Sequence, residues 1–370
     1  MMELLTATLM GSGLVKFQGI SIRNITILLA ILYSLSALKY SRLFLINLFL
    51  LISYITCYSY LYIEGVVEYS DYFVLYTRNL VLVLFLYNYI CCKKTNFSYM
   101  IKVFSYFIIF CAFVNIIIIL TSPKPWLVIA SLSGTDEDSF GHLYNRLIMP
   151  FGTPNQLGFV SALLIIYSIS VKDKITAFLL TIPLLGAASN SSLIPLLLIV
   201  VFQFLPIILK GKVNFKFVIS LSILMVLTLS FALFFDNISV GRDQANMVES
   251  SSRHLMLRLQ TLEGLGSFYL IDFFYGIGVG NSHDFIDGTY SFTIPLTLLF
   301  EMGIGGLFFY YVLPLMLVFR FPSSTRKYFL FFVVSASLLY QLNNDVTYYL
   351  LPIILAYQCW KNENENSLPV

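Results

Sequence analysis

The side chains best suited to chemistry gather in two polar segments, 122–153 and 236–290. These segments hold all three histidines of the chain and several arginines, namely Arg146, Arg253, Arg258, His142, His254 and His283. A guanidinium stays charged and binds phosphate oxygens through two parallel hydrogen bonds. In a partly dry site, such donors stabilise the negative charge that develops on a departing phosphate. The two segments therefore predict a site for an anionic, phosphate-bearing substrate.

Two of these arginines fit that role best. Arg146 precedes the Gly152-Thr153-Pro154-Asn155 turn and the next helix. Arg258 follows His254 by four residues, which places His254 and Arg258 on one helix face. Arg253 points elsewhere if that helix begins upstream. The alternatives are a helix-end anchor for Arg146 and a basic face of an interfacial amphipathic helix for Arg258.

A hydroxyl that attacks a phosphate-activated carbon can need a proton acceptor. The candidates are His283, Asp284, Asp287 and His254, since an imidazole or carboxylate can take that proton. A good leaving group also makes a dedicated base unnecessary. None of the five cysteines has metal-ligand spacing, and no DxD-like pair of acids marks a convincing site, so we expect neither a metal nor another cofactor.

The elements that must position these residues are membrane spans. Of 370 residues, 58% are hydrophobic and 11% charged, against about 25% charged in a soluble domain. Since a spanning helix needs about 20 apolar residues, we expect an all-α, polytopic membrane domain over 1–370 with about 12 spans. The expected spans are 4–19, 24–39, 43–63, 71–91, 98–121, 154–170, 174–189, 191–208, 216–235, 291–319, 327–342 and 345–360.

The basic residues predict the orientation. With both termini in the cytoplasm, fourteen of the 22 lysines and arginines fall in inside connections and seven in outside ones, as the positive-inside rule requires. Both polar segments, 122–153 and 236–290, are then extracytoplasmic loops. Arg78 lies within a span, where a charge is costly and indicates a functional site with a partner, or a side chain that reaches out to the interface.

Four short motifs occur along the polar segments and the spans that follow them. They are Arg146 with Gly152-Thr153-Pro154-Asn155; Ser189-Asn190-Ser191-Ser192; Arg253 and Arg258 with Gly276-Ile277-Gly278; and Glu301-Met302-Gly303. In this order, over roughly 140–320, they resemble the O-antigen ligase/polymerase superfamily. The resemblance implies a multi-pass glycosyltransferase of a bacterial inner membrane.

The residue chemistry and the resemblance together predict the roles of individual residues. We expect Arg146, Arg258, His283 and Asp284 to be catalytic, and Arg253, His254, Asn155, Arg78 and Glu301 to bind substrate. Glu301 could instead close a packed helix bend. The implied partners are an oligosaccharide linked to undecaprenyl diphosphate, membrane lipid and, as a candidate, a chain-length regulator protein, with no nucleic acid.

Three functions fit this description. A polymerase joins lipid-linked repeat units into O-antigen or capsular polysaccharide, a ligase transfers finished glycan to lipid A core, and a flippase moves lipid-linked oligosaccharide across the membrane. Ligases of the superfamily usually carry a histidine pair just before the Glu-x-Gly helix, whereas 288–293 contains no histidine. A flippase would show charges across many spans and short loops on both faces. We therefore expect the polymerase.

Overall fold

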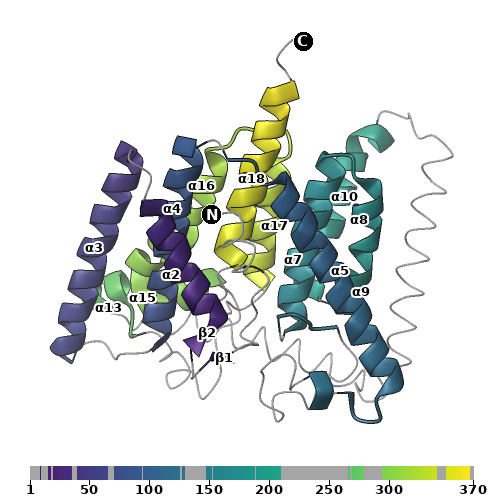
Figure 1. Cartoon of the computed structure of the whole chain (residues 1–370). Helices are drawn as coiled ribbons and strands as arrows, with labels where there is room; N and C mark the ends of the chain where they lie inside the picture. Colours follow the sequence, from purple (N-terminus) through teal and green to yellow (C-terminus); the bar gives the residue numbers. More distant parts are fainter. Residues whose placement is uncertain are drawn as a thin grey trace.

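In the residues that the structure describes, the regular structure is helical apart from one small hairpin. The computed structural model describes residues 9, 16–17, 20–35, 40–65, 71–93, 95–125, 127–129, 147–151, 153–187, 189–209, 266, 269–278, 294–339 and 347–366. Two-residue strands β1 (Lys16–Phe17) and β2 (Ile20–Ser21) pair in antiparallel fashion. The helices stand side by side as a bundle (Figure 1).

The helices follow one another with short connections wherever the structure describes the chain. They are α2 (Ile22–Leu35), α3 (Arg42–Ile63), α4 (Asp71–Lys93), α5 (Ser98–Thr121), α7 (Pro154–Ser170), α8 (Lys174–Leu179), α9 (Thr181–Ala187), α10 (Asn190–Leu209), α13 (Leu270–Tyr275), α15 (Ile294–Leu307), α16 (Leu313–Phe319), α17 (Arg326–Leu339) and α18 (Thr347–Asn366), with the π-helical turn η2 (Phe308–Val312) between α15 and α16.

Within these residues, three helices are long and apolar enough to cross a membrane: Phe44–Ile63, Ser98–Thr121 and Ile294–Phe319. With the composition, they indicate a membrane protein, as expected. The expected span at 216–235 lies outside the described residues. The expected span at 4–19 is wrong at its end, because Lys16–Phe17 forms a strand. Lys16 pairs with Ser21 and Phe17 with Ile20.

Local sequence sets several helix starts. Ser41 caps α3 by accepting a hydrogen bond from the Phe44 amide at 3.1 Å. Asp173 caps α8 in the same way, accepting from the Thr176 amide at 3.1 Å. Pro154 begins α7, where its fixed backbone suits the first helical position and its missing amide proton costs nothing. The long apolar runs then continue as helices because in hydrocarbon each backbone polar group needs an internal partner.

At one end of the bundle, the C-terminal part of α18 contacts the connections between other helices (Figure 1). Three hydrogen bonds join them: the Phe97 amide to Gln358 Oε1 at 2.7 Å, Ser170 Oγ with Cys359 Sγ at 3.2 Å, and Ser324 Oγ to Glu363 Oε1 at 2.6 Å. The same connections and helix ends carry the basic residues Lys93, Lys172, Lys174, Arg320, Arg326, Lys327 and Lys361. The bundle therefore has one basic end.

At the opposite end of the bundle, Asn115 joins α5 to the backbone at Ile148 and Met149. Its side chain on α5 is fully buried, and its Oδ1 accepts the backbone amides of Ile148 and Met149 at 3.0 and 3.2 Å. The Leu147 amide donates to the Gly186 carbonyl at 2.9 Å. These contacts fix the short segment that leads from position 146 into α7.

We expect Asn115→Ala to destabilise the protein strongly. The change leaves two buried amides without a partner, at roughly 1–3 kcal/mol each. Ser105→Ala is the matched control, because Ser105 is also buried on α5 but donates only within that helix, to the Ile101 carbonyl at 2.8 Å. Thermal unfolding of the purified variants in detergent should show a clearly lower midpoint for Asn115→Ala alone. Equal midpoints would contradict the role of Asn115.

Candidate functional site

The structure describes three of the site residues expected from the sequence: Asn155, Arg78 and Glu301. The others lie outside the described residues, namely Arg146, Arg253, Arg258, His254, His283 and Asp284. The three described side chains belong to different helices, α7, α4 and α15. Each of the three therefore has different surroundings.

Asn155 and the Ser-rich turn form one polar cluster. Ser189 Oγ donates to Asn155 Oδ1 at 2.8 Å and shares a hydrogen bond with Ser191 Oγ at 2.8 Å. Gly158, one turn along α7, allows this approach, because an added Cβ would come within 2.9 Å of Ser189 Cβ. Two of the sequence motifs, although 34 residues apart, thus meet in space.

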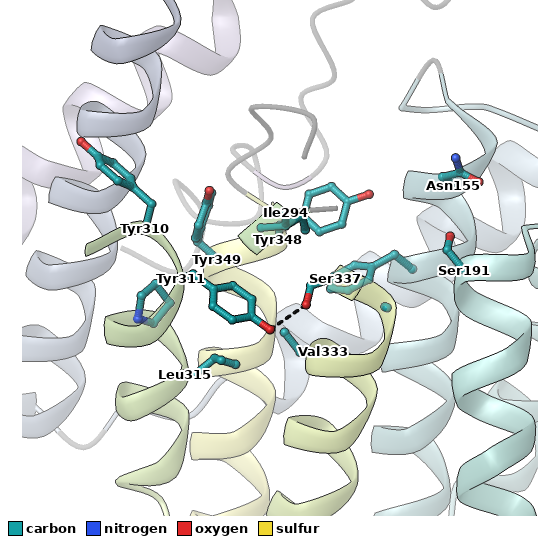
Figure 2. Close-up of a pocket in the computed structure, with 13 residues that line it drawn as sticks. Asn155, Ser191, Ile294, Tyr310, Tyr311, Leu315, Val333, Ser337, Tyr348 and Tyr349 are labelled. Atoms are coloured by element: carbon teal, nitrogen blue, oxygen red, sulfur yellow. Dashed lines mark hydrogen bonds between the residues drawn. The ribbon is translucent and has the colours of Figure 1, made fainter. Parts of the chain in front are cut away.

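This cluster opens into a cavity between α7, α10, η2, α16, α17 and α18 (Figure 2). Its volume is about 40 Å³, which is room for ordered water and well below the roughly 300–1,000 Å³ of ligand pockets. Its polar lining is hydroxyl and amide groups without charge, from Asn155, Ser191, Tyr310, Tyr311, Ser337, Tyr348 and Tyr349.

Two tyrosines show how the cavity is arranged. The Tyr311 hydroxyl is hydrogen-bonded to Ser337 Oγ at 2.7 Å, the dashed line in Figure 2. The Tyr349 hydroxyl is buried and has no hydrogen-bond partner among the described protein atoms. In a cavity of this volume, a buried polar group of this kind favours an ordered water.

Glu301 lies at a break in α15. Gly303 has φ +64° and ψ −165°, which interrupts the helix, and such angles are essentially restricted to glycine. The carbonyls of Phe300 and Glu301 instead accept the amides of Ile277 and Gly278 at 3.1 and 3.0 Å. The Gly-x-Gly turn after α13 therefore packs directly on the Glu-x-Gly motif, and the Glu301 side chain is buried there, at 5% exposure.

Tyr54 on α3 also contacts the backbone at this helix break. Its hydroxyl donates to the Met302 carbonyl at 2.9 Å, and its ring stacks on Tyr275 with centroids 5.9 Å apart. Gly305 provides the room, because a Cβ at that position would overlap the Tyr54 ring. Three helices distant in sequence, α3, α13 and α15, are thereby joined at one point.

Arg78 lies apart from both of these clusters, in a groove between α3 and α4. Its Nε and Nη2 donate to Asn79 Oδ1 at 3.3 and 3.0 Å. Thr77 lines the same groove, and its Oγ1 is hydrogen-bonded to the Tyr310 hydroxyl at 2.8 Å. Because Tyr310 lines the cavity, one hydrogen bond connects the groove with the cavity.

Sequence reasoning missed the residues that hold these parts together: Tyr54, Asn115, Tyr310 and Tyr349. Asn115 had a readable signal, because an amide within an apolar span indicates a buried hydrogen bond. The tyrosines had none, since the chain contains 25 of them and only the tertiary fold distinguishes these.

Comparison with known proteins finds no protein-family model that matches the chain and no curated protein that matches it in sequence. The resemblance to the ligase/polymerase superfamily therefore rests on the motifs alone. Within the described ranges, no three or more histidine, cysteine or acidic side chains come together as a metal site.

We expect Gly276→Ala to be far more damaging than Gly65→Ala. Both glycines have positive φ, +74° and +71°, so both variants carry a backbone cost of roughly 1–3 kcal/mol, and the cost is larger at Gly276, whose ψ of −174° is essentially restricted to glycine. At Gly276 the new Cβ would also overlap the Glu301 and Met302 backbone, whereas Gly65 has nothing within 4 Å. The overlap adds roughly 1–3 kcal/mol.

The measurement is the unfolding midpoint in detergent together with the fraction of monodisperse protein. Gly303→Ala should behave like Gly276→Ala, because its Cβ would overlap the backbone of Phe274 and Tyr275. If Gly65→Ala is equally destabilising, the backbone conformation rather than the close packing carries the effect.

Proposed function

We propose that the protein polymerises oligosaccharide repeat units linked to undecaprenyl diphosphate, on the periplasmic face of a bacterial inner membrane. The observation that carries the proposal is the pairing of the motifs. Asn155 meets the Ser-rich turn, and the Gly-x-Gly turn meets the Glu-x-Gly break. Ile294, the first residue of the broken helix, lines the same cavity as Asn155. The motifs thus form two contacts, and the helix that carries the second contact begins at the cavity lined by Asn155.

The reaction breaks the bond between the anomeric carbon of the donor glycan and its diphosphate oxygen. The hydroxyl oxygen of the acceptor repeat unit forms the new glycosidic bond, and the diphosphate leaves with the bonding electrons. The acceptor's proton passes to a nearby base or to water. Arg146 and Arg258 stabilise the departing diphosphate, and His283 and Asp284 are the candidate bases.

The proposed topology has about 12 spans, with both termini in the cytoplasm and segments 122–153 and 236–290 outside. The basic end of the bundle supports this orientation, because lysine and arginine are retained on the cytoplasmic side. In this orientation, the two contacts between motifs and the cavity lie in the outer half of the membrane, where the lipid-linked glycan is exposed.

Cysteine labelling tests the orientation. In a variant without the five native cysteines, a cysteine at Ser133 or Ser282 should react with an impermeant thiol reagent once the outer membrane is permeabilised. A cysteine at Ser324, at the basic end, should react only after the inner membrane is lysed. The reverse pattern would mean that the chain is inserted the other way round.

Purified protein tests the function. Given only a lipid-linked repeat unit, without lipid A core and without added metal, it should produce a ladder of longer lipid-linked glycans. Transfer that begins only when lipid A core is supplied would identify a ligase. Movement of the lipid across a vesicle membrane without any new glycosidic bond would identify a flippase.

Variants in the same assay test the anion site. Arg146→Ala and Arg258→Ala should each lower the rate by roughly 100-fold or more, because a preorganised donor to the leaving group is lost, and lysine should restore only part of it. Arg42→Ala, at the basic end, is the matched control. His283→Ala should cost much less. Normal ladders from either alanine variant would remove that arginine from the site.

A further inference from the structure

A groove between α3 and α4 has a charged residue in its wall. Its volume is about 410 Å³, within the range of ligand pockets. Its lining is Ile55, Tyr58, Ser59 and Tyr62 from α3, and Phe73, Val74, Thr77 and Arg78 from α4. Arg78 is the one charged residue among them.

The floor of the groove is aromatic and rigid. Tyr58 and Phe73 are buried and stacked, with ring centroids 4.1 Å apart and planes at 11°. Tyr62 and Val74 form an exposed rim. Helix α3 stands at the edge of the bundle (Figure 1). An apolar groove at that position faces lipid, so its occupant is a hydrocarbon chain.

Arg78 places a cation at the end of this groove near the membrane surface. It follows the first residue of α4, Asp71, by seven positions, or about 10 Å along the axis. Its Nε and Nη2 donate to Asn79 Oδ1, which holds the guanidinium at this level of the groove. The full 23 residues of α4 span about 35 Å, slightly more than the roughly 30 Å hydrocarbon core.

We propose that this groove binds the polyprenyl diphosphate part of the substrate lipid, with the first isoprene units against the aromatic floor and the phosphates on Arg78. Charge complementarity supports the assignment, since guanidinium binds phosphate in a bidentate manner. The Thr77–Tyr310 hydrogen bond connects the groove with the cavity at the motif pairs. The assignment rests on the proposed function for the identity of the lipid.

Binding of undecaprenyl diphosphate to the full-length protein in lipid nanodiscs tests the proposal, with native mass spectrometry as the readout. We expect Arg78→Gln to weaken binding about tenfold or more, with partial recovery in Arg78→Lys. Val74→Trp should fill the groove and weaken binding similarly. Val201→Trp is the matched control, because Val201 is equally exposed, on α10. The unfolding midpoint of each variant reports whether it folds.

The choice of ligands separates the possible sources of the phosphate. Undecaprenol, inorganic diphosphate and phosphatidylglycerol should each bind much more weakly than undecaprenyl diphosphate. Equal binding of phosphatidylglycerol or of inorganic diphosphate would overturn the proposal, as would unchanged binding in both Arg78→Gln and Val74→Trp. If the groove binds the lipid as expected but no ladder forms, the proposed polymerase is wrong and the groove stands. If ladders form and the groove variants bind the lipid normally, the proposed groove is wrong and the polymerase stands.

Discussion

The backbone carbonyls freed at Gly303 set the constraint on which the rest of this structure depends. In hydrocarbon, each backbone polar group needs a protein partner, and irregular backbone is tolerated only where it is buried or lines a cavity. Gly303 lies nine residues into α15, about 14 Å along the helix, so water at the membrane surface does not reach it. Ile277, Gly278 and Tyr54 supply the missing donors.

Satisfying these carbonyls fixes the neighbouring elements. Helix α13 has no fully buried residue of its own, yet the backbone contact at Gly276 and Gly303 holds it against α15. Below the break, α15 continues into the π-helical turn that carries Tyr310 and Tyr311. π-Helical turns are frequent at functional sites. The break therefore determines where these two tyrosines enter the cavity, and Tyr310 in turn orders Thr77 on α4.

The sequence predicted what depends on composition and on local chemistry. Apolar runs predicted the helices, and the bounds of α5 and α7 agree with the expected 98–121 and 154–170. The motifs pointed to Gly276–Gly278 and to Glu301–Gly303, with a packed helix bend as one role for Glu301. Neither signal could predict that turn and break pack on each other, because the contact joins backbone to backbone and leaves no side-chain pattern. The hairpin at Lys16–Phe17 was missed because its apolar neighbours resemble a span.

The separation of charge in this region fits a glycosyl transfer. None of the residues that line the cavity is charged. Arg78 lines the groove, which the Thr77–Tyr310 hydrogen bond connects with the cavity. In a medium of low dielectric, a cation next to the attacking hydroxyl would hinder the build-up of positive character at the anomeric carbon, while the same cation beside the diphosphate stabilises the charge that leaves. The uncharged lining of the cavity and the cation in the groove are compatible with both requirements of the proposed transfer, and the Thr77–Tyr310 hydrogen bond joins the two places.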